Sequence, residues 1–190
     1  SDQTFEELTI QPFVASKGAK TAAIADGAGK RVFTLGTGNL TSPFGAGSFD
    51  KNPLATRLTI EYVVPPDMLA HLQRLDAWCV SHSVAQKALL FPDWSESDIG
   101  RNYHSLLTYT DKYDQWRARF KFNTCGLKMC RFWDPETQLQ MKYADVDTKT
   151  AGMCPFVEVT GMWQQGRQFG LTLNILDMRV HAPAAAQYPF

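Results

Sequence analysis

The clearest hydrophobic pattern in the chain lies in residues 117–123, where apolar and polar side chains alternate. Such alternation is typical of a β-strand, because successive side chains point to opposite faces. The apolar positions are Ala118, Phe120 and Phe122, and the polar positions are Arg117, Arg119, Lys121 and Asn123. One face suits a core, while the other carries three cations and no acid. Because like charges on one face repel, this cationic row predicts either an anion lying across it or acids on neighbouring strands that balance the charge.

Similar alternation and apolar runs predict further strands. We expect them over residues 31–35, 54–64, 127–133, 138–144, 156–163 and 169–181. The side chains expected to share one face of the segment 127–133 are Leu127, Met129, Arg131 and Trp133. A glycine between aromatic strand ends predicts a hairpin over residues 163–169.

Two segments instead carry apolar residues at helical spacing, residues 67–91 and 95–107. Asp67 follows a pair of prolines and is expected to cap the first helix. Ser95 is expected to cap the second, with Asp98 as its capping acid. Both helices would be inserted between strands.

The pattern as a whole predicts a mainly β protein with inserted helices and a single domain over residues 31–182. Residues 1–30 are weakly patterned and would form an N-terminal arm or edge strand, with turns at 17–20 and 26–29. Residues 183–190 are rich in proline and alanine and would form a tail.

The net charge of the chain restricts where a polyanion could bind. The 19 basic and 19 acidic residues cancel, so attraction to a polyanion requires a local patch. No apolar run approaches the roughly 20 residues of a membrane span, and no secretory signal opens the chain. The four cysteines lack the spacing of a disulfide scaffold, which favours reduced thiols in an intracellular protein.

The motifs tested for chemistry exclude most enzyme classes. Cys125 and Cys130 do not form a zinc pattern, and residues 24–31 lack a phosphate-binding loop. His71 and His82 are interpreted as surface or boundary residues. Asp145 and Asp147 could hold a divalent ion if that segment were extended, although solvation in a polar loop is the simpler interpretation. We therefore expect no enzyme activity, no cofactor and no resident metal.

Cations interleaved with aromatic rings remain, and this combination suits a single nucleic-acid strand. Cations neutralise the phosphates and flat rings stack on the bases. The candidate cations are Arg117, Arg119, Lys121, Lys128, Arg131 and Arg167, and the candidate rings are Phe44, Trp133, Tyr143 and Trp163, with Tyr113 and Trp116 beside them. Several of these rings must belong to the core instead, and Trp163 is open between the two roles.

The order of these features resembles the single-stranded DNA-binding proteins of large DNA viruses and some phages. The resemblance is carried by residues 41–45 (Thr-Ser-Pro-Phe-Gly), 75–78 (Leu-Asp-Ala-Trp), the cationic row, 155–163 (Pro-Phe-Val-Glu-Val-Thr-Gly-Met-Trp), 169–170 (Phe-Gly) and 179–181 (Arg-Val-His). It spans about residues 30–182 and is one of layout rather than of an invariant signature.

This resemblance implies an OB-fold β-barrel that binds single-stranded DNA without strong sequence preference during replication or recombination, and without catalysis. It places the cationic row and the hairpin at 163–167 beside the DNA, with RNA as the alternative strand and replication proteins as further partners. Relatives often end in an acidic tail, whereas this chain ends Tyr188-Pro-Phe190; either that tail is truncated or partners are recruited differently.

Two other hypotheses stay open at this point. A structural or assembly protein would exchange its terminal arms between subunits and pair its cations with acids across the interface. An enzyme acting on nucleotides would require a metal at Asp145 and Asp147. The DNA hypothesis in turn requires that the cations of residues 117–121 lie together and are not neutralised by local carboxylates.

Overall fold

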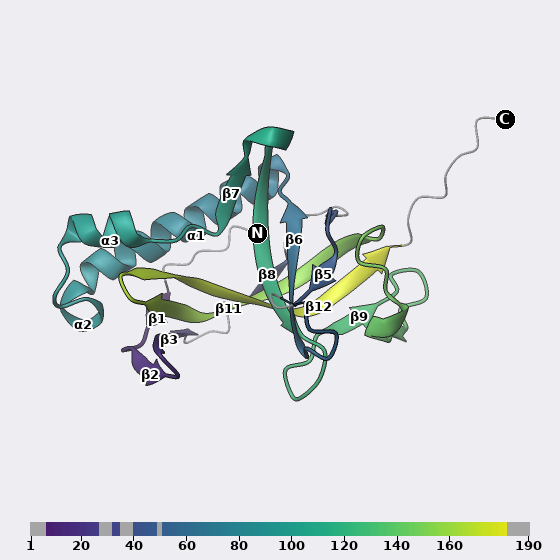
Figure 1. Ribbon diagram of the computed structural model, residues 1–190, viewed down its shortest axis with the longest axis horizontal. Coiled ribbons are helices and arrows are strands. Elements are labelled where there is room, and N and C mark those ends of the chain that lie inside the picture. The colour runs from purple at the N-terminus through teal and green to yellow at the C-terminus, as the bar shows by residue number, and fades with distance from the viewer. Residues whose placement is uncertain (1–6, 27–31, 35–39, 49–50, 182–190) are drawn as a thin grey trace.

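The computed structural model describes residues 7–26, 32–34, 40–48 and 51–181, and it is mainly β (Figure 1). The strands are β1 (Leu8–Ile10), β2 (Val14–Ser16), β3 (Ala19–Asp26), β4 (Val32–Thr34), β5 (Ala46–Gly47), β6 (Arg57–Val63), β7 (Leu107–Thr110), β8 (Gln115–Asn123), β9 (Arg131–Trp133), β10 (Gln140–Met141), β11 (Gly152–Gln165) and β12 (Gln168–His181). The helices are α1 (Pro66–Ala85), α2 (Lys87–Leu90) and α3 (Glu96–Asn102), with 3-10 turns η1 (Asp111–Tyr113) and η2 (Tyr143–Asp145).

One sheet curls until it closes on itself. Its central order is β11–β12–β8–β6, with β12 parallel to β8 and the other neighbours antiparallel. Leu40 exchanges two backbone hydrogen bonds with Met153 of β11, at 2.7 and 2.9 Å. The adjacent Thr41 accepts a bond of 3.1 Å from the Val63 N–H at the end of β6. Residues 40–41 therefore bridge β11 and β6 and complete a barrel, which leaves these strands no open edge there.

The barrel interior takes the apolar side of the alternation. Ala118, Phe120 and Phe122 are each no more than 2% exposed, as the pattern predicts. Tyr62 of β6 is fully buried, and its hydroxyl lies 3.8 Å and 3.7 Å from the sulfurs of Met153 and Met178. Desolvation holds the pKa of Tyr62 well above its usual value. Since the inner face is filled, any ligand must bind on the outer face or at a barrel end.

Helix α1 begins one residue before the expected position. Its N-cap is Pro65 and its first residue is Pro66, so the prediction that Asp67 caps the helix is wrong. Proline suits the first position because its missing N–H would have had no helical partner, and Asp67 in the first turn instead favours the helix dipole. The predicted helix over 67–91 is divided at Gln86 into α1 and α2.

The capping box at Ser95 and Asp98 is confirmed, but α3 ends at Asn102 rather than at 107. A tertiary contact ends it. Asp76 of α1 accepts hydrogen bonds from the Tyr103 hydroxyl at 2.6 Å, from the Leu106 N–H at 3.2 Å and from the Ser105 hydroxyl. These bonds hold residues 103–106 in an extended path that leads into β7.

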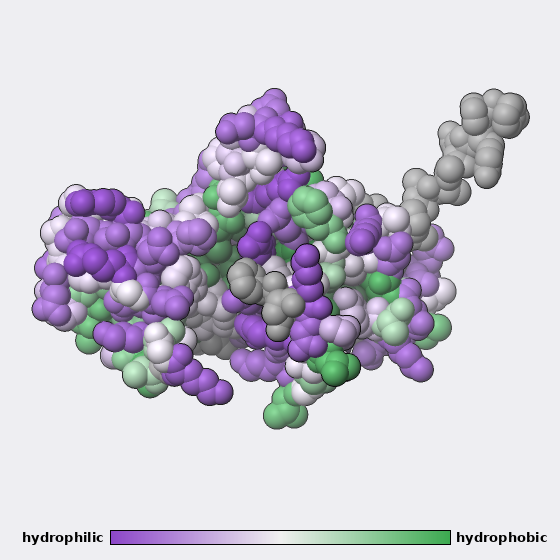
Figure 2. Space-filling view, in the orientation of Figure 1, coloured by the Kyte–Doolittle hydropathy of each residue, from purple (hydrophilic) through white to green (hydrophobic). Residues whose placement is uncertain are grey.

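Two predicted strands are much shorter than their apolar pattern. β9 starts only at Arg131, because Gly126 adopts a φ of +86° and the chain turns through residues 124–129. The prediction that Leu127, Met129, Arg131 and Trp133 share a strand face is therefore wrong, and Leu127 is fully exposed in this turn. Figure 2 shows apolar surface at the lower tip of the molecule, where Figure 1 places the loop between β8 and β9. In the segment 138–144 only Gln140–Met141 is a strand, and Tyr143 begins η2.

The N-terminal part of the described chain extends the sheet of this barrel. β3 pairs with β11 and carries β1 and β2 on its own edges, so residues 8–26 extend the sheet. The hairpin at residues 163–169 is confirmed, with Gly166 at a φ of +57° in the β11–β12 turn.

All four cysteines are free thiols. The proposed domain boundaries at 30 and 182 stay predictions, and the tail at 183–190 and most of the turn at 26–29 lie outside the described residues.

Candidate nucleic-acid interface

A groove of about 390 Å³ lies on the outer face of the barrel, and we call it the cationic groove. Its floor comes from β8 and the start of β12, and its sides come from β6, the end of β11 and the segment that leads into β7. The lining residues are Glu61, His104, Ser105, Leu106, Thr108, Arg117, Arg119, Lys121, Trp163, Leu171, Thr172 and Leu173. The structure thus brings the three cations of the predicted row together with one of the predicted rings.

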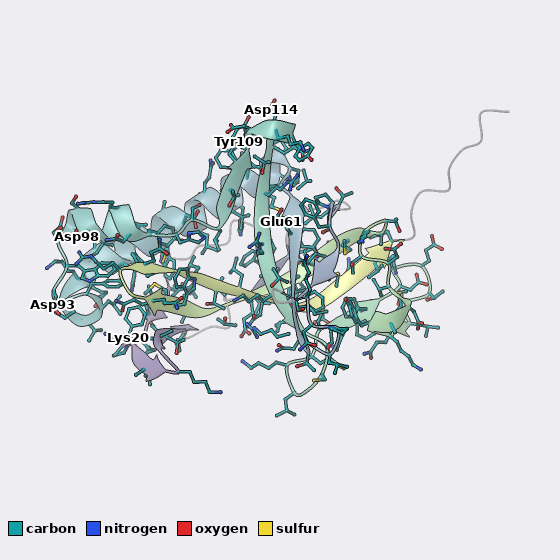
Figure 3. The ribbon with its side chains drawn as sticks, in the orientation of Figure 1. Lys20, Glu61, Asp93, Asp98, Tyr109 and Asp114 are labelled. Atoms are coloured by element: carbon teal, nitrogen blue, oxygen red, sulfur yellow. The ribbon has the colours of Figure 1, made fainter. Side chains whose placement is uncertain are left out.

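The interpretation in which an acid on a neighbouring strand balances the row is correct for two of its three cations, Arg117 and Arg119. β6 runs antiparallel to β8 with Glu61 directly opposite Arg119. The Glu61 carboxylate accepts a hydrogen bond from Arg117 Nη1 at 3.1 Å and another from Arg119 Nη2 at 2.9 Å. Figure 3 shows Glu61 beside these two strands, near the middle of the molecule.

One carboxylate does not neutralise three cations, so the groove lining keeps a positive surplus. Partial burial, and then repulsion from Arg57 of β6, lower the pKa of the Lys121 ammonium. A cation that binds its proton less tightly in the fold gains most when an anion arrives. The groove is thus suited to a phosphate chain.

The two arginines differ in how far a ligand can reach them. The Arg119 side chain is 64% exposed, whereas that of Arg117 is 8% exposed. The Arg117 guanidinium lies 5.1 Å from the ring centres of both Phe44 and Tyr113, within range of a cation–π interaction. Arg119 and Lys121 are therefore the cations presented to a ligand, and Arg117 mainly holds the wall of the groove.

Trp163 is half-buried at the end of β11, and its ring lines the cationic groove. The neighbouring strand makes room for it with Gly170. A Cβ at Gly170 would lie 3.1 Å from the indole and 2.9 Å from the His104 carbonyl oxygen. The His104 ring meets Trp163 edge-on, with the ring centres 5.9 Å apart. Sequence reasoning missed Glu61, His104 and Gly170, although the Phe-Gly step at 169–170 was visible.

The structure places Arg131 and Trp133 elsewhere, in what we call the Asp177 groove. This second groove has a volume of about 680 Å³ and is lined by Thr34, Trp133, Asp134, Pro135, Gln138, Cys154, Phe156, Asp177 and Arg179. Asp177 accepts hydrogen bonds from Arg131 Nη2 at 2.7 Å and from Trp133 Nε1 at 2.8 Å. The two predicted site residues thus share a carboxylate, but not with the cationic row.

The remaining predicted residues are spread around the barrel. Arg167 lies at the β11–β12 turn, where it pairs with Asp98 at 3.3 Å and lies over the Trp94 ring. Lys128 is exposed in the loop after β8. The Tyr143 ring packs on Phe122 and Phe132, with centres 5.8 and 5.5 Å away, so it serves the core. Phe44 is 60% exposed beside the cationic groove.

The described residues give little support to the hypothesis of a metal site at Asp145 and Asp147. None of them form a cluster of three or more His, Cys, Asp or Glu that could hold a metal ion. Asp147 is used locally, since it accepts bonds from the Lys149 N–H and the Thr150 hydroxyl, and these bonds lower its pKa. Within the same residues, no helix combines the length and the apolar character that a membrane span needs.

Comparison with known proteins places the fold. No protein-family model matches the sequence, and no curated protein matches it. The structure is similar to gp2.5, a single-stranded DNA-binding protein encoded by bacteriophage T7, with a TM-score of 0.54 over 84% of this chain and 98% of that chain, at 9% identity. It is also similar to the single-stranded DNA-binding protein of bacteriophage Enc34 in complex with single-stranded DNA, with a TM-score of 0.50, 95% and 99% coverage, and 8% identity.

These similarities concern architecture, because so few residues are identical. They confirm the predicted resemblance to phage proteins of this kind and the predicted mainly β, OB-type fold with inserted helices.

Proposed function

We propose that this protein binds single-stranded DNA in the cationic groove, without strong sequence preference and without catalysis, in replication or recombination. The observation that carries the proposal is the meeting of Arg119, Lys121 and Trp163 in one open groove on a closed barrel. Two cations can contact phosphates while the indole stacks on a base, and neither contact distinguishes one base from another.

Charge and strain support the same proposal. The chain has no net charge, yet it gathers three cations in this groove. Partial burial, and then repulsion from Arg57 of β6, lower the pKa of Lys121 and so disfavour its charged form in the free protein. Local conflicts of this kind concentrate at functional sites, where a ligand removes them. The two phage proteins with the same fold are described as binding single-stranded DNA, which agrees with the proposal.

The site we propose is smaller than the one that the sequence predicts. It keeps Arg119, Lys121 and Trp163 as contacts, with Arg117 and Phe44 as their support. Trp133 lines the Asp177 groove and Arg131 is bonded to Asp177. Arg167 and Tyr143 are held by neighbours, and Lys128 is exposed in the loop after β8, so we leave these five out. Association with replication proteins and self-association stay predictions.

The test is a titration of a fluorescent single strand of about 16 nucleotides, the upper end of the range for one OB-fold. Duplex DNA and RNA of the same sequence are compared at low and high salt. We expect the single strand to bind most tightly, with affinity falling as salt rises because phosphate contacts release counterions. Arg119→Ala should weaken binding and flatten that salt dependence.

Arg101→Ala is the matched control, because Arg101 is a 69% exposed arginine on α3 that does not line the cationic groove. It should leave the affinity unchanged. Equal affinity of Arg119→Ala and the unmodified protein would contradict the proposed site, and absence of salt-dependent binding would contradict the function.

A further inference from the structure

We infer that Glu61 occupies the position of a DNA phosphate in the free protein and thereby lowers the affinity of the cationic groove for single-stranded DNA. This inference rests on the proposed function and deepens it. It makes Glu61 an affinity-determining residue rather than a support for the sheet.

The geometry of the carboxylate is that of an anion held between two guanidinium groups. Its two oxygens are divided between two partners, Oε1 with Arg117 Nη1 at 3.1 Å and Oε2 with Arg119 Nη2 at 2.9 Å. Guanidinium groups bind carboxylate and phosphate through the same donors at the same distances. The space between these two arginines is therefore an anion site, already filled by a residue of the chain.

The pairing of the strands creates this site. Glu61 is the register partner of Arg119, and Val63 is that of Arg117. Since residues directly opposite on antiparallel strands point to the same face, the carboxylate must emerge among the guanidinium groups. The backbone pairing of β6 with β8 does not by itself require an acid at position 61, although the enclosed Arg117 guanidinium donates a hydrogen bond to the one that is there.

Exposure decides what a ligand can displace. The Glu61 side chain is 19% exposed and lines the groove, so an approaching strand meets its negative charge. Arg119 is open enough to exchange the carboxylate for a phosphate, whereas Arg117 is enclosed and keeps its bond to Glu61. Each bound strand therefore competes with Glu61 for Arg119 and also lies near the negative charge of the Glu61 carboxylate.

Asp177 provides a natural comparison. It too is 19% exposed, and it holds two donors at similar distances, Arg131 and the neutral Trp133 indole. Its removal changes the total charge of the protein by the same amount, but outside the cationic groove. A substitution at Asp177 therefore separates a local effect at Glu61 from a general gain of positive charge.

The experiment compares Glu61→Gln and Asp177→Asn with the unmodified full chain, using an oligothymidine of about 16 nucleotides over a series of salt concentrations. We expect Glu61→Gln to bind about 5-fold more tightly at low salt, equivalent to about 1 kcal/mol and in line with one exposed ion pair. The slope of log affinity against log salt should steepen by about 0.7, the value for one more phosphate contact on a single strand. At about 0.1 M salt, Asp177→Asn should shift the affinity by less than about 2-fold, since charge at that ionic strength is screened beyond about 10 Å.

Unchanged or weaker binding by Glu61→Gln, with thermal unfolding showing a folded protein, would overturn the inference and give Glu61 a positioning role. A gain of equal size in Asp177→Asn would also overturn it. If the unmodified chain does not bind the oligonucleotide, the proposed function itself fails, which is a different result.

The unmodified protein offers a second readout that needs no folded variant. The carbon-13 resonance of the Glu61 carboxylate should shift on saturation with the oligonucleotide, because Arg119 leaves it for a phosphate. A resonance that stays in place while the DNA is bound would overturn the inference.

Discussion

The two grooves of this barrel contain the same parts in different proportions. Each presents an indole and a carboxylate that holds two donors, Glu61 in one and Asp177 in the other. The lining of the cationic groove has three cations and one carboxylate, whereas the lining of the Asp177 groove has one cation, Arg179, and two carboxylates. Under the proposed function, an aromatic ring in a groove is not sufficient for a nucleic-acid site. The sign of the charge around the ring separates the two grooves, because a phosphate chain must be neutralised along its path.

The largest expected difference between the two grooves comes from removing two cations from each. Replacing both Arg119 and Lys121 by Ala should weaken single-strand binding by about 100-fold or more at low salt, since contacts to charged groups contribute about 1.5–3 kcal/mol each. The pair Arg131→Ala and Arg179→Ala in the Asp177 groove should change the affinity by less than about 3-fold, the size of a weak surface charge effect. Titration at two salt concentrations measures both, and similar losses in the two pairs would mean that DNA uses both grooves.

The second largest expected difference is between the two groove tryptophans, Trp163 and Trp133. Trp163→Ala should weaken DNA binding by about 1–3 kcal/mol, as expected for the loss of one stacked base. The salt dependence of the affinity should change little. Trp133→Ala should leave binding nearly unchanged and instead destabilise the fold, because it removes the indole partner of Asp177. Intrinsic fluorescence quenching by the oligonucleotide provides the readout, and quenching that persists without Trp163 would refute its assignment.

A methyl group added at Gly170 tests whether the position of the Trp163 indole matters for DNA binding. Gly170→Ala forces a Cβ against the indole and the His104 carbonyl, and should destabilise the protein by about 1–3 kcal/mol, as overpacking does. It should also weaken DNA binding by moving the ring. Gly100→Ala in α3 is the control, since nothing lies within 4 Å of its Cβ, and it should stabilise the helix by about 0.5–1 kcal/mol. Thermal unfolding and titration of both variants give the comparison.

The smallest effect concerns the partial burial, and then the repulsion from Arg57, that lower the pKa of Lys121. Because the fold lowers its pKa, the unfolded chain binds a proton more tightly than the folded one between the lowered value and the usual value of about 10.4. The stability of the unmodified protein should therefore rise as the pH increases through this window, relative to Lys121→Gln. At neutral pH, Lys121→Gln should be as stable or slightly more stable, by less than about 1 kcal/mol, while it binds DNA less well. A clear loss of stability would show that Lys121 supports the fold instead.

Sequence reasoning was most successful where a pattern is local. The alternation over residues 117–123 identified β8 and its inner face, and Ser95 with Asp98 identified the start of α3. It was least successful where a distant residue or an unrecognised turn decides the outcome. The end of α3 depends on Asp76, and the break before β9 depends on the turn at Gly126, whose φ is positive. Apolar residues in 127–130 imitate a strand because hydrophobic pattern alone does not show where the chain must reverse.

The sequence by itself determined that three cations emerge on one face of a strand whose other face is buried, since the two-residue period of a strand requires it. Only the tertiary structure decided that Glu61, 56 residues from Arg117, stands among them. It also decided that Trp163 joins the cations while Trp133 does not. The physical reason is that side-chain direction follows from local backbone geometry, whereas strand partners and register follow from packing summed over the whole barrel.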